Sequence, residues 1–484
     1  GDMTMMQKMK RMTAAATALL LLNLTAVPGC AEEQTAAQST GGISQETMQL
    51  YQSWKTRYVT QDTYVTTEPQ YYVYYSEKHY AGDSVSVPVT VSEAHGYGML
   101  IFAGMADYDT QAKEYFDGMY RYFKAHPSDI GAHLMSWQQC DNGSALIDGA
   151  TDGSMTGGEC DSATDGDMDI AYALLAADAA WGSGGDIDYL GEAKLVIGDI
   201  MRYDVNHEFW TLTLGDWVSQ CDSSESYYHA TRSSDFIMQY LPVFAEVSGD
   251  ANWLKVYDTT YQIIQEVTAG SGTGLLPDFI VRSSSGTFEP ASANFLESDA
   301  DGMYSYNSCR TPWRIGLDCL LTGNETAKQF ARQITSFIME KTGGDPEEIK
   351  AGYALDGTAI EDYDDLCFTA PFLIAAACTD QQTWHDKLRQ TIVDYGDDVY
   401  YGDTIRLLCL MADDGGWPMP AKSESMIMGD VNGDGTLSLA DLVLLQKYLL
   451  RQDALKQWEA GDLDGDGNVS GLDLAALKQK VVTL

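Results

Sequence analysis

The run ATDGDMDIAYALLAADAAW at residues 163–181 carries the clearest information about the fold. It places three carboxylates, Asp165, Asp167 and Asp169, at the start of an otherwise apolar segment. Acidic side chains are favoured at a helix N-terminus, where unpaired backbone N–H groups and the helix dipole attract negative charge. The run therefore predicts an apolar helix with an acidic start, and capping alone would explain any one of the three carboxylates.

Helix-like periodicity continues on both sides of this run. Apolar residues recur at three- and four-residue intervals, and loops rich in Gly, Asp and Ser separate the stretches. Strand-like alternation is confined mainly to 71–75 and 85–89. So many paired helices predict a helical barrel or a solenoid, and no sequence repeat supports the solenoid. The stretches expected to be helical are 91–105, 111–125, 167–181, 190–203, 233–246, 253–267, 309–321, 325–340, 368–377 and 383–394.

Residues 163–181 match the signature of glycoside hydrolase family 8 at every position: Ala-(Ser/Thr)-Asp-(Ala/Gly)-Asp, two variable residues, (Ile/Met)-Ala and a later Trp. The chain resembles this family from about residue 51 to residue 411. The resemblance implies a mostly α fold, an (α/α)6 barrel, with an open cleft for a glucan chain. It also implies that Asp165 forms hydrogen bonds with the distorted sugar at the cleavage point.

Two further segments are similar to family motifs. SEAHGYG at 92–98 resembles the general-acid motif, so we expect Glu93 to be the acid, although Glu93 alone would also fit as a helix cap. YNSCRTPWR at 306–314 resembles the segment that often holds the general base. Asn307 stands where many members have the base Asp, and an amide does not accept a proton at neutral pH. Another base is therefore required.

The preceding loop offers that base in the Phe-Leu-Glu sequence at 295–297. It is similar to a subgroup in which a Glu in an inserted loop replaces the Asp, a subgroup that includes endoglucanases, lichenases and chitosanases. We expect Glu297 to be the base, with Asp299 and Glu289 as weaker candidates. An inverting glycosidase needs one protonated carboxyl and one carboxylate about 6.5–9.5 Å apart. Glu93 and Glu297 would take these two roles.

Three more residues are candidates for substrate binding. Arg310 lies where it could steer the base or the sugar. Trp137 and Trp313 are candidate stacking platforms, because aromatic faces bury the C–H faces of pyranose rings. Trp313 is almost equally well explained as a core residue.

The last stretch of the chain holds two segments with the spacing of calcium-binding loops, in which oxygen ligands occupy positions 1, 3, 5, 9 and 12. A glycine at position 6, Gly435 in the first loop and Gly467 in the second, permits the sharp turn. Each loop runs into a helix, expected at 439–450 and 472–481. Two copies make a chance acidic turn a poor explanation, so we expect two structural calcium ions. The expected ligands are Asp430, Asn432, Asp434, Ser438 and Asp441 in the first loop, and Asp462, Asp464, Asp466, Ser470 and Asp473 in the second.

Both loops end in Asp where an EF-hand usually has Glu, and no convincing helix precedes either loop. This pattern resembles a dockerin, the small all-α module that attaches cellulosomal enzymes to cohesin domains of a scaffold protein. In that family, loop positions 10 and 11 help to select the cohesin. They are Leu439-Ala440 and Gly471-Leu472 here, and they differ from the Ser/Thr pairs of the best-known clostridial type.

Charge and the N-terminal sequence limit the function further. The net charge of −42 argues against nucleic-acid partners, which require a surplus of Lys and Arg. Basic residues followed by the apolar run 13–27 predict a secretory signal, since that run is too short to span a membrane. Lipid attachment at Cys30 is a weaker alternative, because Pro28 fits a lipoprotein box badly. Cys319, Cys367, Cys378 and Cys409 lie in apolar runs and are interpreted as small buried residues.

These observations divide the chain into a signal peptide at 1–31, a tether at 32–45, the catalytic barrel at 46–414, a linker at 415–428 and the dockerin at 429–484. They predict a secreted inverting endo-β-glucanase that cleaves internal β-1,4 bonds of cellulose or mixed-linkage β-1,3-1,4-glucan and is tethered to a cellulosome. One alternative is a chitosanase using the same site. Another is a non-catalytic carbohydrate-binding scaffold component, and a calcium-dependent adhesion protein would leave the match at 163–181 unexplained.

Overall fold

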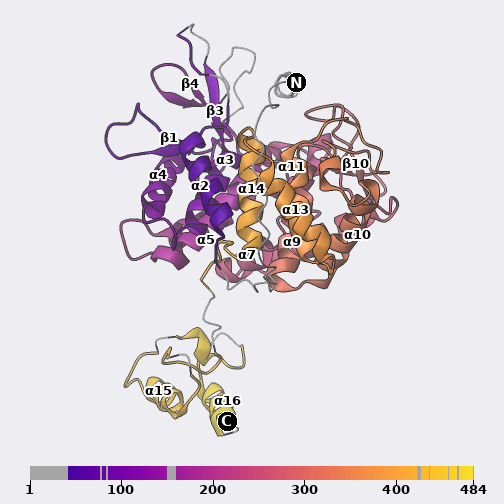
Figure 1. The fold of residues 1–484 in the computed structure, drawn as a ribbon. Helices are drawn as coiled ribbons and strands as arrows, with labels where there is room; N and C mark the ends of the chain where they lie inside the picture. The colour runs from indigo at the N-terminus through magenta and orange to yellow at the C-terminus, as the bar shows by residue number, and fades with distance from the viewer. Residues whose placement is uncertain are drawn as a thin grey trace, which may run out of the picture. The chain divides into compact units, whose positions relative to one another are not determined.

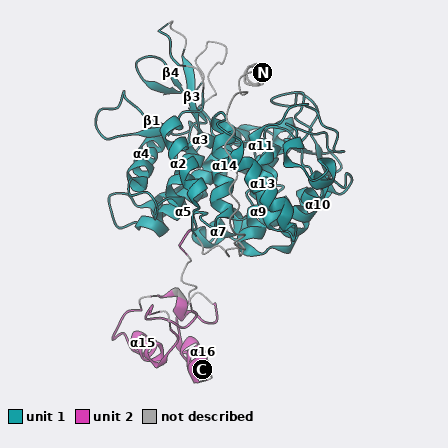
Figure 2. Cartoon of the chain, in the orientation of Figure 1, with its two compact units in different colours: residues 1–419 teal, residues 420–484 magenta. Residues whose placement is uncertain are grey.

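The computed structural model describes residues 42–76, 79–82, 86–149, 160–421, 427–434, 436–455, 457–465 and 468–482. The expected signal peptide, residues 32–41 of the tether, Gly435, Asp466 and Gly467 lie outside these ranges. The chain forms two compact units, one reaching Met419 and the other starting at Pro420 (Figure 2). Among the described residues, no helix has the length and apolar character needed to cross a bilayer.

The first unit is mostly α and forms the expected (α/α)6 barrel (Figure 1). Its main helices alternate along the chain between an outer and an inner ring. The outer helices are α2 (Gln45–Tyr58), α4 (Ala112–Ala125), α6 (Tyr189–Asp199), α8 (Asn252–Thr268), α10 (Glu325–Lys341) and α13 (Gln382–Asp394). The inner helices are α3 (Ser92–Gly104), α5 (Thr164–Trp181), α7 (Tyr240–Ser248), α9 (Thr311–Thr322), α12 (Pro371–Ala377), which follows the short α11 (Leu366–Thr369), and α14 (Tyr400–Asp413).

Burial explains which helices form the inner ring. In α5 every residue from Thr164 to Ala177 is buried, and α14 is buried from Gly402 to Ala412. A helix that is apolar on all sides has to be enclosed by other elements, whereas a helix with one polar face can cover a surface. The outer helices α4 and α10 are of the second kind, with buried residues on one face only. The four cysteines in apolar runs are buried in this core, as expected.

Short antiparallel sheets and single turns of other helices connect the main helices. The sheets are β1 (Val59–Gln61) with β2 (Tyr71–Val73), β3 (Val87–Val91) with β4 (Gln138–Asp141) and β5 (Leu146–Asp148), β6 (Val205–Asn206) with β7 (Thr211–Leu212), and β8 (Ala230–Arg232) with β9 (Phe279–Arg282) and β10 (Phe288–Pro290). Single turns are η1 (Ile200–Asp204), η2 (Asp216–Gln220), η3 (Ser226–His229), η4 (Ser233–Asp235), η5 (Ser308–Arg310) and η6 (Pro346–Glu348). The sequence predicted β2 and β3 alone among these strands.

The inner helices start at one end of the barrel, because an outer helix returns the chain between them. The starts of α3 and α5 approach closely there, since a Cβ on Gly166 would lie 2.7 Å from the backbone carbon of Ser92. A Cβ on Gly96 would lie 2.6 Å from the Cβ of Asp169 in the same way. These two glycines therefore allow Glu93 and Asp165, one residue from Ser92 and Gly166, to meet.

The last residues of the first unit pack into the barrel. Trp417 is buried and packs edge-on against Trp313, with ring centroids 6.1 Å apart. A Cβ on Gly104, at the C-terminal end of α3, would lie 3.1 Å from the carbonyl oxygen of Gly416. Residues 415–419, which the sequence analysis places in the linker, thus belong to the packed barrel.

The second unit contains α15 (Leu439–Leu449), η7 (Glu459–Gly461) and α16 (Gly471–Val482). Its small core is built around Val431, Leu445 and Leu477, all fully buried. Helices α15 and α16 pack against each other, each directly after one of the expected calcium loops.

Candidate active site

The side chain of Arg310, at the start of α9, joins two carboxylates from different helices. Its Nη1 donates to Oε2 of Glu93 over 2.7 Å and to Oδ2 of Asp165 over 2.9 Å. Glu93 and Asp165 each lie in the first turn of their helices, α3 and α5. Tyr97, one turn further along α3, also accepts a hydrogen bond from Nη1 over 3.2 Å. The structure therefore brings together three residues that the sequence predicted for the site.

Each oxygen of the Glu93 carboxyl group has its own partner. Arg310 contacts Oε2, and the hydroxyl of Tyr400, at the start of α14, donates to Oε1 over 3.1 Å. Burial raises the pKa of Glu93 above its ordinary value, although Arg310 and Tyr400 oppose this shift. A carboxyl group with a raised pKa keeps its proton at a pH where an exposed glutamate has lost it, which suits a general acid.

Asp165 has the opposite tendency. Burial acts to raise the pKa of Asp165, but Arg310, Arg232 and Arg314 together hold it below its usual range. Asp165 is therefore ionised and can accept hydrogen bonds from sugar hydroxyls. Two neighbouring carboxyl groups with shifts in opposite directions are typical of sites that carry out acid–base chemistry.

Asn307 links this group to the inserted loop. Its Oδ1 accepts a hydrogen bond from Nη2 of Arg310 over 3.0 Å, and its Nδ2 donates to Oε2 of Glu297 over 2.8 Å. Asp278 braces the same turn by accepting hydrogen bonds from the backbone N–H and the hydroxyl of Ser308. Neither Asp299 nor Glu289 contacts Asn307 or Arg310 in the described part of the chain. Glu297 is the one of the three base candidates that the fold brings to the site.

The loop that carries Glu297 is organised around a buried carboxylate, Asp301. The backbone N–H groups of Leu296 and Glu297 donate to Oδ2 of Asp301 over 2.7 and 2.9 Å, and that of Ser298 donates to Oδ1 over 2.8 Å. Asp301 is fully buried, whereas the Glu297 side chain is 46% exposed. The loop is therefore fixed from inside while Glu297 remains open to solvent.

Arg232, at the end of β8, holds the second oxygen of Glu297. Its Nη2 lies 3.2 Å from Oε1 of Glu297, and its guanidinium lies over the ring of Phe279, 5.1 Å from the centroid. Sequence reasoning missed Arg232, Asp301 and Tyr400. None lies in a family motif that the sequence analysis used, but each is a polar residue at an element end or in a loop, where functional residues concentrate.

The two tryptophans predicted as stacking platforms differ in their exposure to solvent. Trp137 is partly exposed, and its carbonyl oxygen accepts the backbone N–H of Ser92, so it lies beside the start of α3. Trp313 is completely buried between Tyr97, Trp417 and the guanidinium of Arg314, which lies 4.1 Å from its centroid. A ring without exposed surface cannot stack on a sugar. Trp313 is therefore a core residue, which corrects the prediction that it is a platform.

The other two acids of the opening run are structural. Asp169 forms a buried ion pair with Arg314 and accepts a hydrogen bond from the hydroxyl of Tyr240 over 2.9 Å. Asp167 accepts the backbone N–H of Met135 over 3.1 Å. Of the three, Asp165 alone contacts Arg310.

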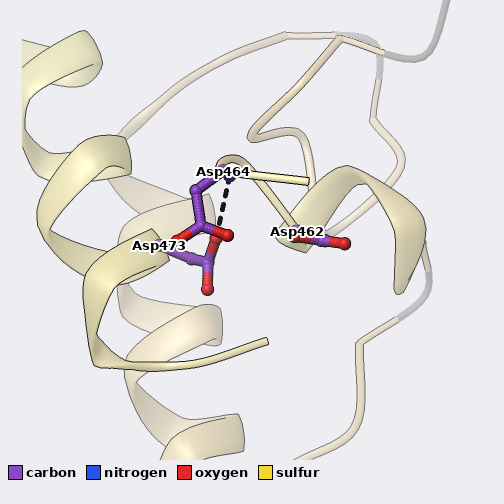
Figure 3. A group of neighbouring side chains, drawn as sticks. All are labelled: Asp462, Asp464 and Asp473. Atoms are coloured by element: carbon purple, nitrogen blue, oxygen red, sulfur yellow. Dashed lines mark hydrogen bonds between the residues drawn. The ribbon is translucent and has the colours of Figure 1, made fainter. Parts of the chain in front are cut away.

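The second unit carries the predicted calcium loops. Carboxylate oxygens of Asp462, Asp464 and Asp473 lie within 4.8 Å of one another (Figure 3). In both loops the acid at position 12, Asp441 or Asp473, is fully buried and accepts backbone N–H groups from its own loop. Burial acts to raise the pKa of Asp473, but these hydrogen bonds hold it below its usual range. Converging ionised oxygens are the ligands that calcium prefers, so the residues present fit this ion.

Comparison with known sequences gives two family matches. The profile of glycosyl hydrolases family 8 matches residues 25–415, and that of the dockerin type I domain matches residues 428–482. Type I dockerins bind calcium and attach to cohesins.

Individual relatives agree with these matches. A β-glucanase of Niallia circulans is 44% identical over 370 residues, covering 76% of this chain and 83% of the relative. An endoglucanase of Bacillus sp. (strain KSM-330) is 33% identical over 400 residues, covering 81% of each chain. Among solved structures, the apo β-1,3-1,4-glucanase from Paenibacillus sp. X4 superposes with a TM-score of 0.69 at 43% identity, covering 77% of this chain and 92% of that one.

Proposed function

Because the chain belongs to glycosyl hydrolases family 8 and ends in a type I dockerin domain, we propose that it is a secreted inverting endo-β-glucanase held in a cellulosome. Its substrate is mixed-linkage β-1,3-1,4-glucan or cellulose, in which it cleaves internal β-1,4 bonds. The name of the solved β-1,3-1,4-glucanase at 43% identity favours the mixed-linkage polymer.

One observation carries the proposed mechanism: the hydrogen bond of 2.8 Å between Nδ2 of Asn307 and Oε2 of Glu297. It places a carboxylate beside the amide that replaces the usual base. Arg310 and Asn307 lie between Glu93 and Glu297 as two consecutive hydrogen-bonded side chains. Carboxyl groups joined through two side chains are too far apart for direct contact, which leaves room for a sugar and the attacking water.

The reaction follows from this arrangement. Glu93, whose pKa is raised by burial, donates its proton to the glycosidic oxygen as the bond to the anomeric carbon breaks. Glu297 accepts a proton from water, which attacks that carbon from the opposite face and inverts its configuration. Asp165 holds the sugar at the cleavage point through its hydroxyls, and Arg310 fixes Asp165 relative to Glu93.

Substitution of the two carboxyl groups tests the assignment. Glu93→Gln and Glu297→Gln should each reduce kcat on lichenan by about 10²–10⁴-fold with an unchanged melting temperature. Glu289→Gln is the matched control and should retain activity. Substantial activity in Glu297→Gln would overturn the assignment of the base, and inactivity of the wild type on every polysaccharide would favour a non-catalytic scaffold component.

Substrate and stereochemistry are tested separately. Carboxymethylcellulose, lichenan and chitosan compared side by side should give the highest rate on lichenan, and a preference for chitosan would establish the chitosanase alternative. Proton NMR of the first products should show α-anomers released from β-linked glucan. Initial release of β-anomers would rule out inversion.

We also propose that each dockerin loop holds one structural calcium ion through the ligands expected from the sequence, of which Asp466 lies outside the described residues. The symmetric hydrogen bonding of Asp441 and Asp473 supports two equivalent sites. The ions stabilise the unit that binds cohesin and take no part in hydrolysis.

A further inference from the structure

A tyrosine-rich pocket adjoins the general acid, and Tyr400, which contacts Glu93, is the one residue of its lining described so far. Its volume is about 300 Å³, and its walls come from the end of α2, the segment after β2 and the start of α14. The lining residues are Arg57, Tyr58, Tyr74, Tyr75, Ser76, His79, Asp398, Val399 and Tyr400. From these contacts we infer that the pocket is a subsite for a glucose residue on the leaving-group side of the cleavage point, an inference that rests on the proposed function.

The chemistry of the walls fits a sugar. Aromatic faces cover the C–H faces of a pyranose ring, while tyrosine hydroxyls, a guanidinium and a carboxylate reach its hydroxyl groups. Tyr74 and His79, which both line the pocket, stack on each other with ring centroids 5.0 Å apart. A volume of about 300 Å³ is at the small end of ligand pockets, so it suits a short piece of a chain.

Hydrogen bonds and an ion pair hold both walls of the pocket. The backbone N–H of Tyr74 donates to the carbonyl of Tyr58 over 2.7 Å, and that of Tyr75 donates to the carbonyl of Val89 over 3.0 Å. On the other wall, Arg57 forms an ion pair with Asp403 and donates to the carbonyl of Asp398 over 2.6 Å. Walls held in this way lose little conformational entropy when a ligand binds.

Tyr400 connects the pocket to the general acid. Its hydroxyl contacts Oε1 of Glu93, whereas Asp165 and Asn307 are reached through Arg310 from Oε2. Asp165 and Glu297 act on the sugar whose anomeric carbon is attacked. The pocket is instead connected to Glu93 through Tyr400 and Oε1. We therefore assign it to the sugar that leaves with the protonated glycosidic oxygen.

Cleavage of mixed-linkage gluco-oligosaccharides of increasing length, labelled at the reducing end, tests this assignment. Tyr74→Ala and His79→Ala should lower kcat/KM by about tenfold on substrates long enough to fill the pocket. They should leave the shortest cleaved substrate unaffected. The cleaved bond should also move toward the reducing end, because fewer sugars are held beyond the cleavage point. Tyr74→Phe keeps the aromatic face and should behave like the wild type.

Tyr108→Ala is the matched control, since this exposed tyrosine follows α3 at the other end of the barrel. Equal loss at every length, no change in the pattern, or movement toward the non-reducing end would each overturn the assignment. Calorimetry with cellotriose and the Glu297→Gln variant adds a test that does not require turnover. Binding there should weaken about tenfold with Tyr74→Ala, and unchanged affinity would contradict the subsite. Failure of the wild type to hydrolyse glucan would instead contradict the proposed function.

Discussion

Glu93 has partners that act on its pKa in opposite directions. Burial and the negative charge of Asp165 raise it, whereas the positive charge of Arg310 and the hydroxyl of Tyr400 lower it. The hydroxyl acts by donating to Oε1, since a donated hydrogen bond stabilises the ionised carboxylate. Tyr400 therefore adjusts the pH range in which Glu93 can donate a proton.

Tyr400→Phe should shift the alkaline limb of kcat/KM to higher pH. Loss of the hydroxyl removes a group that favours the ionised form of Glu93, so the pKa of Glu93 rises. Because Glu93 must be protonated to act, activity then persists to higher pH. The measurement is kcat/KM on lichenan against pH for the variant and the wild type. Tyr108→Phe, at an exposed tyrosine remote from Glu93, should leave the limb in place, and a shift of the Tyr400→Phe limb to lower pH would contradict the argument.

At the scale of residues, the sequence was informative where a segment resembles a family motif. Glu93, Asp165 and Arg310 lie within such segments at the beginnings of α3, α5 and α9, and the resemblance was sufficient to propose them. The contact of Tyr400 with Glu93 joins residues 307 positions apart, and no local pattern reports such a contact. Trp313 was ambiguous because an aromatic residue in an apolar helix fits the core and a platform equally well.

At the scale of elements, the crossing of α3 and α5 sets the distance between Glu93 and Asp165. Both helices begin with short-chain residues at the contact, and Gly166 leaves no room for a methyl group against Ser92. Interiors packed this closely transmit small displacements to their neighbours.

Gly166→Ala should lower the free energy of unfolding by about 1–3 kcal/mol and reduce kcat, because the helix starts have to separate. Gly198→Ala is a matched control in α6, where an added Cβ meets no atom within 4 Å, and it should be neutral or stabilising by about 0.5–1 kcal/mol. Thermal unfolding and lichenan hydrolysis measure both effects. Full activity and unchanged stability in Gly166→Ala would show that the crossing is not tight.

The loop after β10 allows a similar test. Asp301→Ala removes the acceptor of three backbone N–H groups and should lower kcat by about tenfold to a hundredfold, since Glu297 would lose its fixed position. Affinity for oligosaccharides should change little, because Asp301 is buried beneath the loop. Asp301→Asn keeps one acceptor oxygen and should be intermediate. A loss of affinity with unchanged kcat would contradict this role.

Among the main helices of the first unit, sequence pattern predicted most, including the buried helices α3 and α5, and missed two. The sequence analysis expected neither α2 nor α14. In α14 the residues from Gly402 to Ala412 are all buried, so its apolar residues show no helical period. The expected helix at 233–246 begins only at Tyr240, because η4 occupies its start, where the Ser233 hydroxyl donates to the carbonyl of Pro277.

At the scale of the whole molecule, chemistry and attachment belong to different units. The carboxylates around Arg310 lie in the first unit, and the calcium loops lie in the second. The two functions can therefore be removed one at a time.

Chelation by EDTA should abolish cohesin binding and leave lichenan hydrolysis within about twofold of its initial rate. Loss of the ions exposes converging carboxylates to mutual repulsion in the second unit alone. Pull-down with a panel of cohesins and a reducing-sugar assay on the same sample measure both outcomes. Glu297→Gln is the reciprocal control, which should bind cohesin normally without hydrolysing glucan, and loss of hydrolysis on chelation would contradict the separation.

The burial of Trp417 in the barrel has a mechanical consequence. Tension applied through the linker reaches the first unit at Trp417 and Met419, which contact the core residues Trp313 and Tyr172. The load is thus carried by core residues of the inner helices, and Trp313 lies in the first turn of α9, three residues after Arg310. A different attachment module fused after Met419 would pull on the same anchor.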